Sequence, residues 1–206
     1  MAIQNMRVKI SAILLAAGLS QRMGSDKLLL EYRGKLILQH SIDLLFELPV
    51  YEHIIVTTDA RSKHIALTQN VKLCINDQPE SGLSKSIHIG VEKANGTHYL
   101  FLTADQPKLE KTDIMPILEA AKNNPDKIVY PVIDSTPVSP AIFPGSFRRE
   151  LLELYSSSQE KQNDIGGRSI RDANKQINLR LEPENPANFI DIDTVDDYRN
   201  LIKELG

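Results

Sequence analysis

The chain contains one cysteine, Cys74, and this scarcity excludes several kinds of site. A single cysteine cannot form a disulfide within the chain, and it cannot supply the several thiolates of a cysteine-based zinc cluster. Cys74 lies in the strand-like sequence VKLCI, where a free cysteine ordinarily acts as a small apolar core residue. We therefore assign Cys74 to the core and give it no chemistry.

Strong charge of one sign and long apolar segments are also lacking. The formal net charge is −3 over 206 residues, so the composition does not indicate the basic surface typical of nucleic-acid binding. No apolar run approaches the roughly 20 residues of a membrane-spanning helix, and no segment marks an exposed apolar patch. We expect one domain over residues 1–206, a monomer without nucleic-acid or membrane partners.

An apolar run over residues 10–19 has two interpretations. It follows Arg7 and Lys9 and ends near small residues, as in a secretory signal, whose apolar region covers roughly 7–15 residues. It also fits a buried first strand, and the residues after it continue an alternation of strands and helices. We favour the strand and a cytoplasmic protein, with the secretory signal as the alternative.

Strand-like and helix-like segments alternate along most of the chain. Runs that are short, rich in β-branched residues and apolar on both faces are typical of buried parallel strands. They cover residues 8–16, 53–58, 71–75, 98–103 and 127–132. Helical patterns lie between them, beginning near Leu36 and after the candidate N-caps Ser84 and Thr112. This alternation predicts a three-layer α/β/α sandwich with a mostly parallel sheet.

The alternation loosens after Pro131. Residues 134–140 contain two prolines among polar residues and predict a loop or an edge excursion, and a helix is expected over residues 146–155. The polar run 156–164 lacks an apolar anchor and is expected to be mobile. Residues 194–197 form a candidate capping box before a last helix.

The stretch ILLAAGLSQRMGSDK, residues 13–27, ends an apolar run in small residues and continues with polar and cationic ones. It lacks G-x-G-x-x-G, since five residues separate Gly18 from Gly24, and it lacks a P-loop, because Lys27 comes three residues after Gly24. Backbone N–H groups after a strand can nevertheless bind phosphate oxygens, and Arg22 and Lys27 add positive charge there. A triphosphate loop and a generic turn with surface cations both fit this spacing.

The sequence LAAGLSQRMGSDKLLLEYRGKLIL, residues 15–38, resembles the signature of the MobA-like nucleotidyltransferases, L-A-(A/G)-G-x-S-x-R-M-G-x-x-K. Five more motifs follow in family order: SGLSKSI, TADQP, SPAIF, DIGGRSI and DIDTVDD. The chain is most similar to the molybdenum cofactor cytidylyltransferases and related molybdenum hydroxylase accessory proteins. The resemblance covers nearly the whole chain and implies a Rossmann-like fold of the nucleotide-diphospho-sugar transferase type.

The resemblance implies that a phosphate monoester attacks the α-phosphorus of a nucleoside triphosphate and that pyrophosphate leaves. This reaction requires alignment of two anionic substrates and neutralisation of the charge on the leaving group. By resemblance, Lys27 contacts the phosphates at the reacting centre and Arg22 holds the triphosphate tail. Asp105 in TADQP occupies the family's magnesium position, usually written G-D-Q-P, with Ala104 in place of the glycine.

The implied cofactor is Mg²⁺ or Mn²⁺, and Mg²⁺ prefers one or two carboxylates together with phosphate oxygens and water. Asp191 and Asp193 are candidates to complete the site with Asp105. They alternate along a strand-like segment and so should point to opposite faces. We expect one of them to reach the metal, and the family analogy favours Asp193. Asp197 is expected to serve the start of the following helix instead.

Base choice is predicted from Ala17, where cytidylyltransferases of the family carry alanine and guanylyltransferases carry glycine. A methyl group there narrows the pocket floor and disfavours a purine by steric conflict. We therefore expect CTP as the substrate. The residues expected to bind the nucleotide are Leu15, Ala16, Ala17, Gly18, Ser20, Gly24, Asn76, Gly82 and Ser84. Asn76 fits a turn residue equally well, and Ser84 a plain N-cap.

The acceptor side rests on the motifs around residues 139–143 and 164–170, which in the family help form a pterin-phosphate site. Ser139 stands where the family commonly has histidine, so some acceptor contacts are in doubt. Arg168 suits a phosphate or carboxylate contact, and a simple helix start is the alternative.

The predicted activity is CTP:molybdopterin cytidylyl transfer with small-molecule substrates, in the service of a molybdenum hydroxylase. One alternative keeps the chemistry with GTP or with another phosphate-monoester acceptor. A second is a cofactor chaperone without catalysis, against which the presence of Lys27 and Asp105 counts. A third is an NAD-dependent oxidoreductase, against which the missing dinucleotide fingerprint counts.

Overall fold

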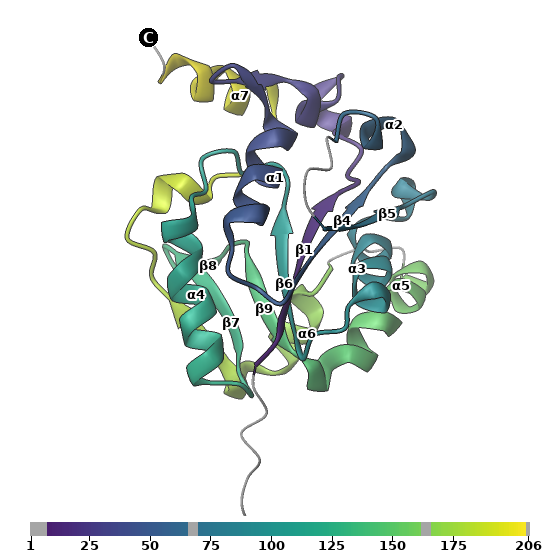
Figure 1. Cartoon of the computed structure of the whole chain (residues 1–206), viewed down its shortest axis with the longest axis vertical. Coiled ribbons are helices and arrows are strands. Elements are labelled where there is room, and N and C mark those ends of the chain that lie inside the picture. The colour runs from purple at the N-terminus through teal and green to yellow at the C-terminus, as the bar shows by residue number, and fades with distance from the viewer. Residues whose placement is uncertain (1–7, 66–69, 162–165, 205–206) are drawn as a thin grey trace, which may run out of the picture.

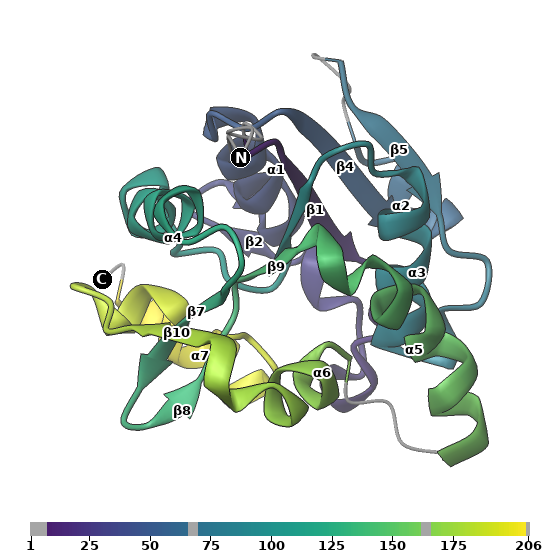
Figure 2. The same cartoon turned by 90° about the horizontal axis from the view of Figure 1, so that it is seen from below.

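The computed structural model describes residues 8–65, 70–161 and 166–204. In this part of the chain a mixed sheet lies between two layers of helices (Figures 1 and 2). Its strands follow the order β10-β7-β9-β6-β1-β4-β5, and β8 pairs with β7 outside this path. The predicted three-layer α/β/α sandwich is confirmed.

Most neighbouring strands of the sheet are parallel. The exceptions are β9, which lies antiparallel between β6 and β7, and β8, which is antiparallel to β7. The strands are β1 (Ile10–Ala16), β4 (Glu52–Thr57), β5 (Lys72–Ile75), β6 (His98–Thr103), β7 (Ile128–Ile133), β8 (Thr136–Pro137), β9 (Ala141–Pro144) and β10 (Asn178–Leu181). A separate hairpin consists of β2 (Glu31–Tyr32) and β3 (Lys35–Leu36).

The two faces of β1 carry two hydrophobic clusters. Ala12 and Leu14 belong to the cluster that α1, α4 and α7 cover, whereas Ile13 and Leu15 belong to the cluster under α3, α5 and α6. The helices are α1 (Ile37–Glu47), α2 (Asp59–Ser62), α3 (Leu83–Lys93), α4 (Lys111–Asn123), α5 (Arg148–Lys161), α6 (Arg168–Ala173) and α7 (Val195–Lys203). Because side chains alternate along a strand, one apolar strand serves both layers.

The five predicted strands are all present, each within two residues of its expected bounds. The apolar run at residues 10–19 contributes β1 to the centre of the sheet, where all seven strand residues are buried. Cys74 is buried in β5 as expected, and burial raises the pKa of its thiol, which keeps it protonated. No helix in the described segments is long and apolar enough to cross a membrane.

Several predicted details are wrong. Gly82, at φ 86°, is the N-cap of α3, and Glu110 caps α4 through a reciprocal pair with Asp113, so Ser84 and Thr112 both lie inside their helices. The segment with Asp191 and Asp193 is not a strand.

The region after Pro131 is more regular than expected. It contains β8, β9 and β10, and α5 continues to Lys161 through most of the polar run, whose last residues lie outside the described chain. The capping box of Thr194 and Asp197 is confirmed at the start of α7.

Candidate active site

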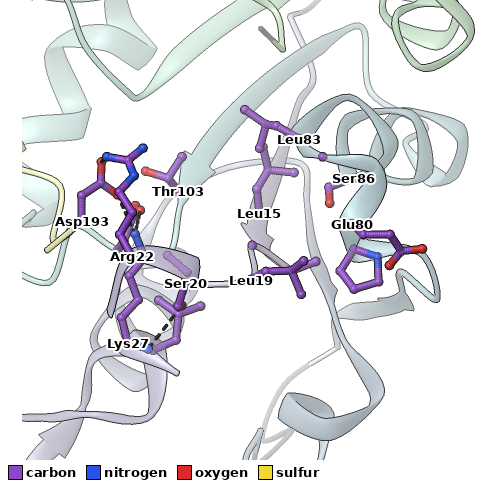
Figure 3. Close-up of a pocket in the computed structure, with 17 residues that line it drawn as sticks. Leu15, Leu19, Ser20, Arg22, Lys27, Glu80, Leu83, Ser86, Thr103 and Asp193 are labelled. Atoms are coloured by element: carbon purple, nitrogen blue, oxygen red, sulfur yellow. Dashed lines mark hydrogen bonds and ion pairs between the residues drawn. The ribbon is translucent and has the colours of Figure 1, made fainter. Parts of the chain in front are cut away.

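A cavity of about 400 Å³ opens at the carboxyl ends of β1 and β6. This edge is where open α/β sheets bind ligands. Figure 3 shows Lys27, Arg22 and Asp193 at one end of the cavity and Glu80 and Ser86 at the other. The cations Lys27 and Arg22 suit an anionic tail at their end, and Leu15, Leu19 and Leu83 lie between the two ends (Figure 3).

The loop after β1 reaches this cavity through a tight turn. Ser20 takes a left-handed conformation at φ 53° and Gly24 another at φ 68°, and they flank the short 3-10 turn Gln21–Met23. The Ser20 carbonyl accepts a hydrogen bond from the Met23 N–H at 2.9 Å, and the Ser20 hydroxyl accepts one from the Lys27 N–H at 3.3 Å. Ser20 therefore stabilises the loop that presents Lys27.

Lys27 is the charged centre of the site. Its Nζ lies 2.7 Å from Asp105 Oδ2 and 2.9 Å from Asp193 Oδ1, and its side chain is 11% exposed. Burial by itself lowers the pKa of Lys27, but the charge of Asp105 and the hydrogen bonds to both carboxylates outweigh it and raise this pKa above its ordinary value. Lys27 is an ammonium throughout the neutral range.

Arg22 borders the same group from the solvent side. Its Nη1 lies 3.6 Å from Asp193 Oδ2, and its side chain is 75% exposed. An ion pair this exposed contributes little to stability. The guanidinium is thus available for an anionic ligand at small energetic cost.

Asp105, Asp191 and Asp193 concentrate negative charge beside Lys27. Burial of its carboxyl, together with the charges of Asp105 and Asp193, raises the pKa of Asp191 to about 7, although the residue as a whole is exposed. Asp105 Oδ1 is buried without a hydrogen-bond partner in the described chain. Within that part, no set of three or more His, Cys, Asp or Glu side chains is arranged to hold a metal ion.

A second cavity of about 240 Å³ adjoins the first. The two share Leu15, Leu83 and Thr103 in their walls. The second is lined mainly by apolar side chains, together with the cations Arg168 and Arg171. Two adjoining cavities provide space for two substrates that react with each other.

The predicted nucleotide and catalytic residues divide into two sets. Those that line the first cavity are Leu15, Ala17, Gly18, Ser20, Arg22, Lys27, Gly82, Asp105 and Asp193. Those that do not are Ala16, Gly24, Asn76, Ser84 and Asp191. Asn76 is buried, and it donates to Ser86 Oγ at 3.0 Å and accepts from the Gln78 N–H at 3.0 Å, so it organises the cavity wall from behind.

Arg168 lines the second cavity and pairs with Asp172 at 3.6 Å. It belongs to the motif at residues 164–170, of which Asp164 and Ile165 lie outside the described chain.

Several residues at the site were missed by the sequence reasoning. Glu80 and Ser86 line the first cavity, Arg171 lines the second, and Thr103 lines both. Arg61 lies behind the loop and contacts it directly. A usable signal existed for Arg61: it closely follows a predicted parallel strand, so its side chain starts from the same sheet edge as Lys27.

A family model described as the MobA-like NTP transferase domain matches residues 12–177. A Rhodopirellula baltica protein named probable molybdenum cofactor guanylyltransferase is 31% identical over 123 residues, covering 57% of this chain and 58% of that protein. A Bacillus mycoides protein with the same name is 24% identical over 96% of this chain and 98% of its own. The Escherichia coli molybdenum cofactor cytidylyltransferase is 25% identical over 92% of this chain and 93% of its own.

Among solved structures, a Mycobacterium tuberculosis protein superimposes with a TM-score of 0.77 at 21% identity, over 96% of this chain and 100% of that chain. A second structure of that protein, in complex with manganese, has a TM-score of 0.69 at 20% identity, over 95% of this chain and 98% of that chain. Likeness at this level of identity shows the fold.

Proposed function

The chain belongs to the MobA-like NTP transferase family, and on that premise we propose that it transfers a cytidylyl group from CTP to the phosphate of a molybdopterin-type cofactor. An acceptor phosphate oxygen attacks the α-phosphorus, the bond to the α–β bridging oxygen breaks, and pyrophosphate leaves with that electron pair. The observation that carries the proposal is the group of Lys27, Asp105 and Asp193 at the end of a cavity lined by the loop after β1.

The cations of the loop serve the triphosphate. Lys27 exchanges one of its carboxylate partners for a phosphate oxygen and stabilises charge that develops on the leaving pyrophosphate. Arg22, already near the cavity mouth, presents a planar fork to the outer phosphates. Alignment of two anions against each other requires this neutralisation before attack can occur.

The acidic groups fit a divalent cation. Asp105 supplies a buried oxygen that has no hydrogen-bond partner among the described residues, and two carboxylates suffice when phosphate oxygens and water complete the coordination. Asp105 and Asp193 would hold Mg²⁺ or Mn²⁺, which when bound supplies positive charge between the triphosphate and the carboxylates. Support from a relative is the manganese complex of the mycobacterial structure.

Selection of the base rests on Ala17. Its side chain lines the cavity and is buried, so its methyl group occupies space at the floor. A smaller pyrimidine tolerates this loss of volume better than a purine does. Guanylyl transfer remains the second candidate, because the relatives from R. baltica and B. mycoides carry guanylyltransferase names.

The acceptor is assigned to the second cavity, where apolar walls suit a planar ring system and Arg168 and Arg171 suit its phosphate. Arg171 is the better placed of the two. Its side chain is 13% exposed and its guanidinium lies 4.9 Å from the Tyr130 ring centroid, so it is held in one orientation.

The proposal is tested by thermal unfolding with CTP, GTP, ATP or NADH, each with and without Mg²⁺. A ligand at about 100 times its dissociation constant stabilises the fold by roughly 2.7 kcal/mol. We expect a Mg²⁺-dependent rise in Tm with CTP that Asp105→Ala abolishes. Asp43→Ala is the matched control, because Asp43 lies on α1 outside this cavity and pairs with Lys35 of β3.

The other results would change the proposal in different ways. A rise with GTP in place of CTP overturns the base assignment and keeps the chemistry. A rise with NADH favours an oxidoreductase, and no rise with any nucleotide favours a cofactor chaperone. Where CTP binds, release of pyrophosphate on addition of molybdopterin tests the acceptor.

A further inference from the structure

Arg61 is a buried cation that contacts the loop after β1 from behind. Its side chain is 4% exposed, although arginine is almost never fully buried unless it is paired. Its Nη1 donates to the Ala16 carbonyl at 2.7 Å, its Nη2 to the Gly18 carbonyl at 2.6 Å and its Nε to Asp26 Oδ2 at 2.6 Å. One planar group therefore fixes three points of the loop.

The two carbonyl contacts set the direction of the neighbouring amides. In a trans peptide the C=O of one residue and the N–H of the next point in opposite directions. With the carbonyls of Ala16 and Gly18 directed at Arg61, the N–H groups of Ala17 and Leu19 point away from it. Ala17 and Leu19 line the cavity, whereas Arg61 does not.

The third contact reaches Lys27. Asp26 uses one oxygen for Arg61 and the other to accept the Leu28 N–H at 3.1 Å, which caps the short turn Lys27–Leu29. Both carboxylate oxygens are thus committed. The backbone from which Lys27 extends is held on one side by Asp26 and on the other by the bond from its own N–H to Ser20.

We propose that Arg61 is a positioning residue for the triphosphate site, whose guanidinium holds the loop amides and Lys27 toward the phosphates. It does not touch the substrate. Its kinetic test rests on the proposed nucleotidyl transfer. Its second test, hydrogen exchange of the loop amides, depends on the loop geometry alone.

The experiment compares Arg61→Met and Arg61→Lys with the wild type in the full chain, at a temperature well below the Tm of each variant. We measure kcat and KM for CTP, and hydrogen exchange of the amides of residues 17–28. Arg61→Met should lower kcat about 100-fold, as misplacement of reacting groups by about 1 Å does. Arg61→Lys should lower it about tenfold, since one ammonium cannot reach three separated acceptors.

Exchange in the loop should accelerate in both variants while the strands stay protected. Arg149→Met is the matched control, because Arg149 is 85% exposed and pairs along α5 with Glu153, away from the loop after β1. It should change neither readout. If Arg61→Met does not fold, Asp26→Asn is used instead, because it removes the negative charge that pairs with Arg61. We expect it to lower kcat about tenfold.

The inference would be overturned if Arg61→Met had the same kcat and the same hydrogen-exchange rates in the loop as the wild type. The inference would also be wrong if amides across the whole sheet lost protection from hydrogen exchange and Arg61→Met and Arg61→Lys lowered kcat equally. That result would mean that Arg61 has only a structural role. If the wild type turns over neither CTP nor GTP, the proposed function fails, and hydrogen exchange still decides the role of Arg61.

Discussion

Thr103 and Thr57 are the last residues of β6 and β4, the two strands that flank β1, and their hydroxyls differ in hydrogen bonding. The Thr57 hydroxyl is buried and donates to the Ala16 carbonyl at 3.3 Å. The Thr103 hydroxyl is buried and has no partner in the described chain, although the residue lines both cavities. A buried polar group without a partner costs about 1–3 kcal/mol.

The two threonines should therefore respond oppositely to valine, which keeps the shape and removes the hydroxyl. We expect Thr103→Val to raise the free energy of unfolding by about 1 kcal/mol and Thr57→Val to lower it by about 1 kcal/mol. For a domain of this size such changes move Tm by roughly 2–4 °C. Thermal melts of both variants check this, and a lower Tm for Thr103→Val would show that its hydroxyl is satisfied after all.

Residues at the site differ in how well the sequence could predict them. Lys27 and Asp105 lie in motifs with a physical rationale, and the structure brings them together across 78 positions of sequence. Arg61 lies in none of the quoted motifs, and Thr103 begins TADQP without a role of its own there, because the roles of both come from contacts that exist only after folding. Asp191 was expected to face away from Asp193, but the segment is not a strand, so the alternation rule does not apply.

At the scale of elements, α3 packs closely on the centre of the sheet through a glycine. A Cβ at Gly90 would lie 2.5 Å from Ile13 Cγ2 and 3.4 Å from Val56 Cγ2. Ile13 is fully buried and its β-branched side chain has little rotamer freedom. The contact therefore has no room for a methyl group.

Gly90→Ala has two opposing effects on stability, a gain in helix propensity and a loss from crowding against Ile13. Alanine gains about 1 kcal/mol over glycine inside a helix, whereas overfilling a core costs about 1–3 kcal/mol. We expect a net loss of about 1 kcal/mol in denaturant unfolding, with an unchanged m-value. A gain in stability would mean that Ile13 and α3 move apart without cost.

The elements that the sequence predicted well are those with strong apolar patterns. The parallel strands are buried on both faces, so their composition alone identifies them. By contrast, β8 has two residues, and β9 begins after Pro140 and ends with Pro144. At the sheet edge, all four residues of β10 are partly or fully exposed. The sequence did not predict that α5 continues through the polar run after Tyr155. That run has no apolar residues at helical spacing, which is the pattern by which a helix is recognised.

For the molecule as a whole, stability depends on pH through a buried histidine far from the cavity. Burial lowers the pKa of His98, although the Pro125 carbonyl and Asp126 oppose the shift. Its Nε2 lies 2.8 Å from the Pro125 carbonyl and its Nδ1 lies 3.0 Å from Thr97 Oγ1, so the neutral ring joins β6 to the turn after α4.

The sign of the effect follows from linkage. Because the folded pKa is below the unfolded value of about 6.5, the unfolded state takes up protons first as the pH falls. Stability contributed by neutral His98 is complete above that value and is lost as the pH decreases toward the folded pKa. His98→Gln keeps a donor for Pro125 and cannot be protonated, so its stability should fall less than that of the wild type between pH 7 and pH 5. Denaturant titrations at the two pH values measure this, and equal losses would exclude His98 as the source.

The position of Asp193 has a consequence for the time at which the site is completed. Asp193 lies beyond the matched family model, which ends at residue 177, and it follows Lys27 by 166 positions. Chains emerge from the ribosome at about 5–20 residues per second, so the two partners emerge roughly ten to thirty seconds apart. During synthesis, Lys27 and Asp105 can meet as an incomplete pair well before the second carboxylate exists. A nascent chain therefore acquires its full charge arrangement only after every described strand of the sheet has been made.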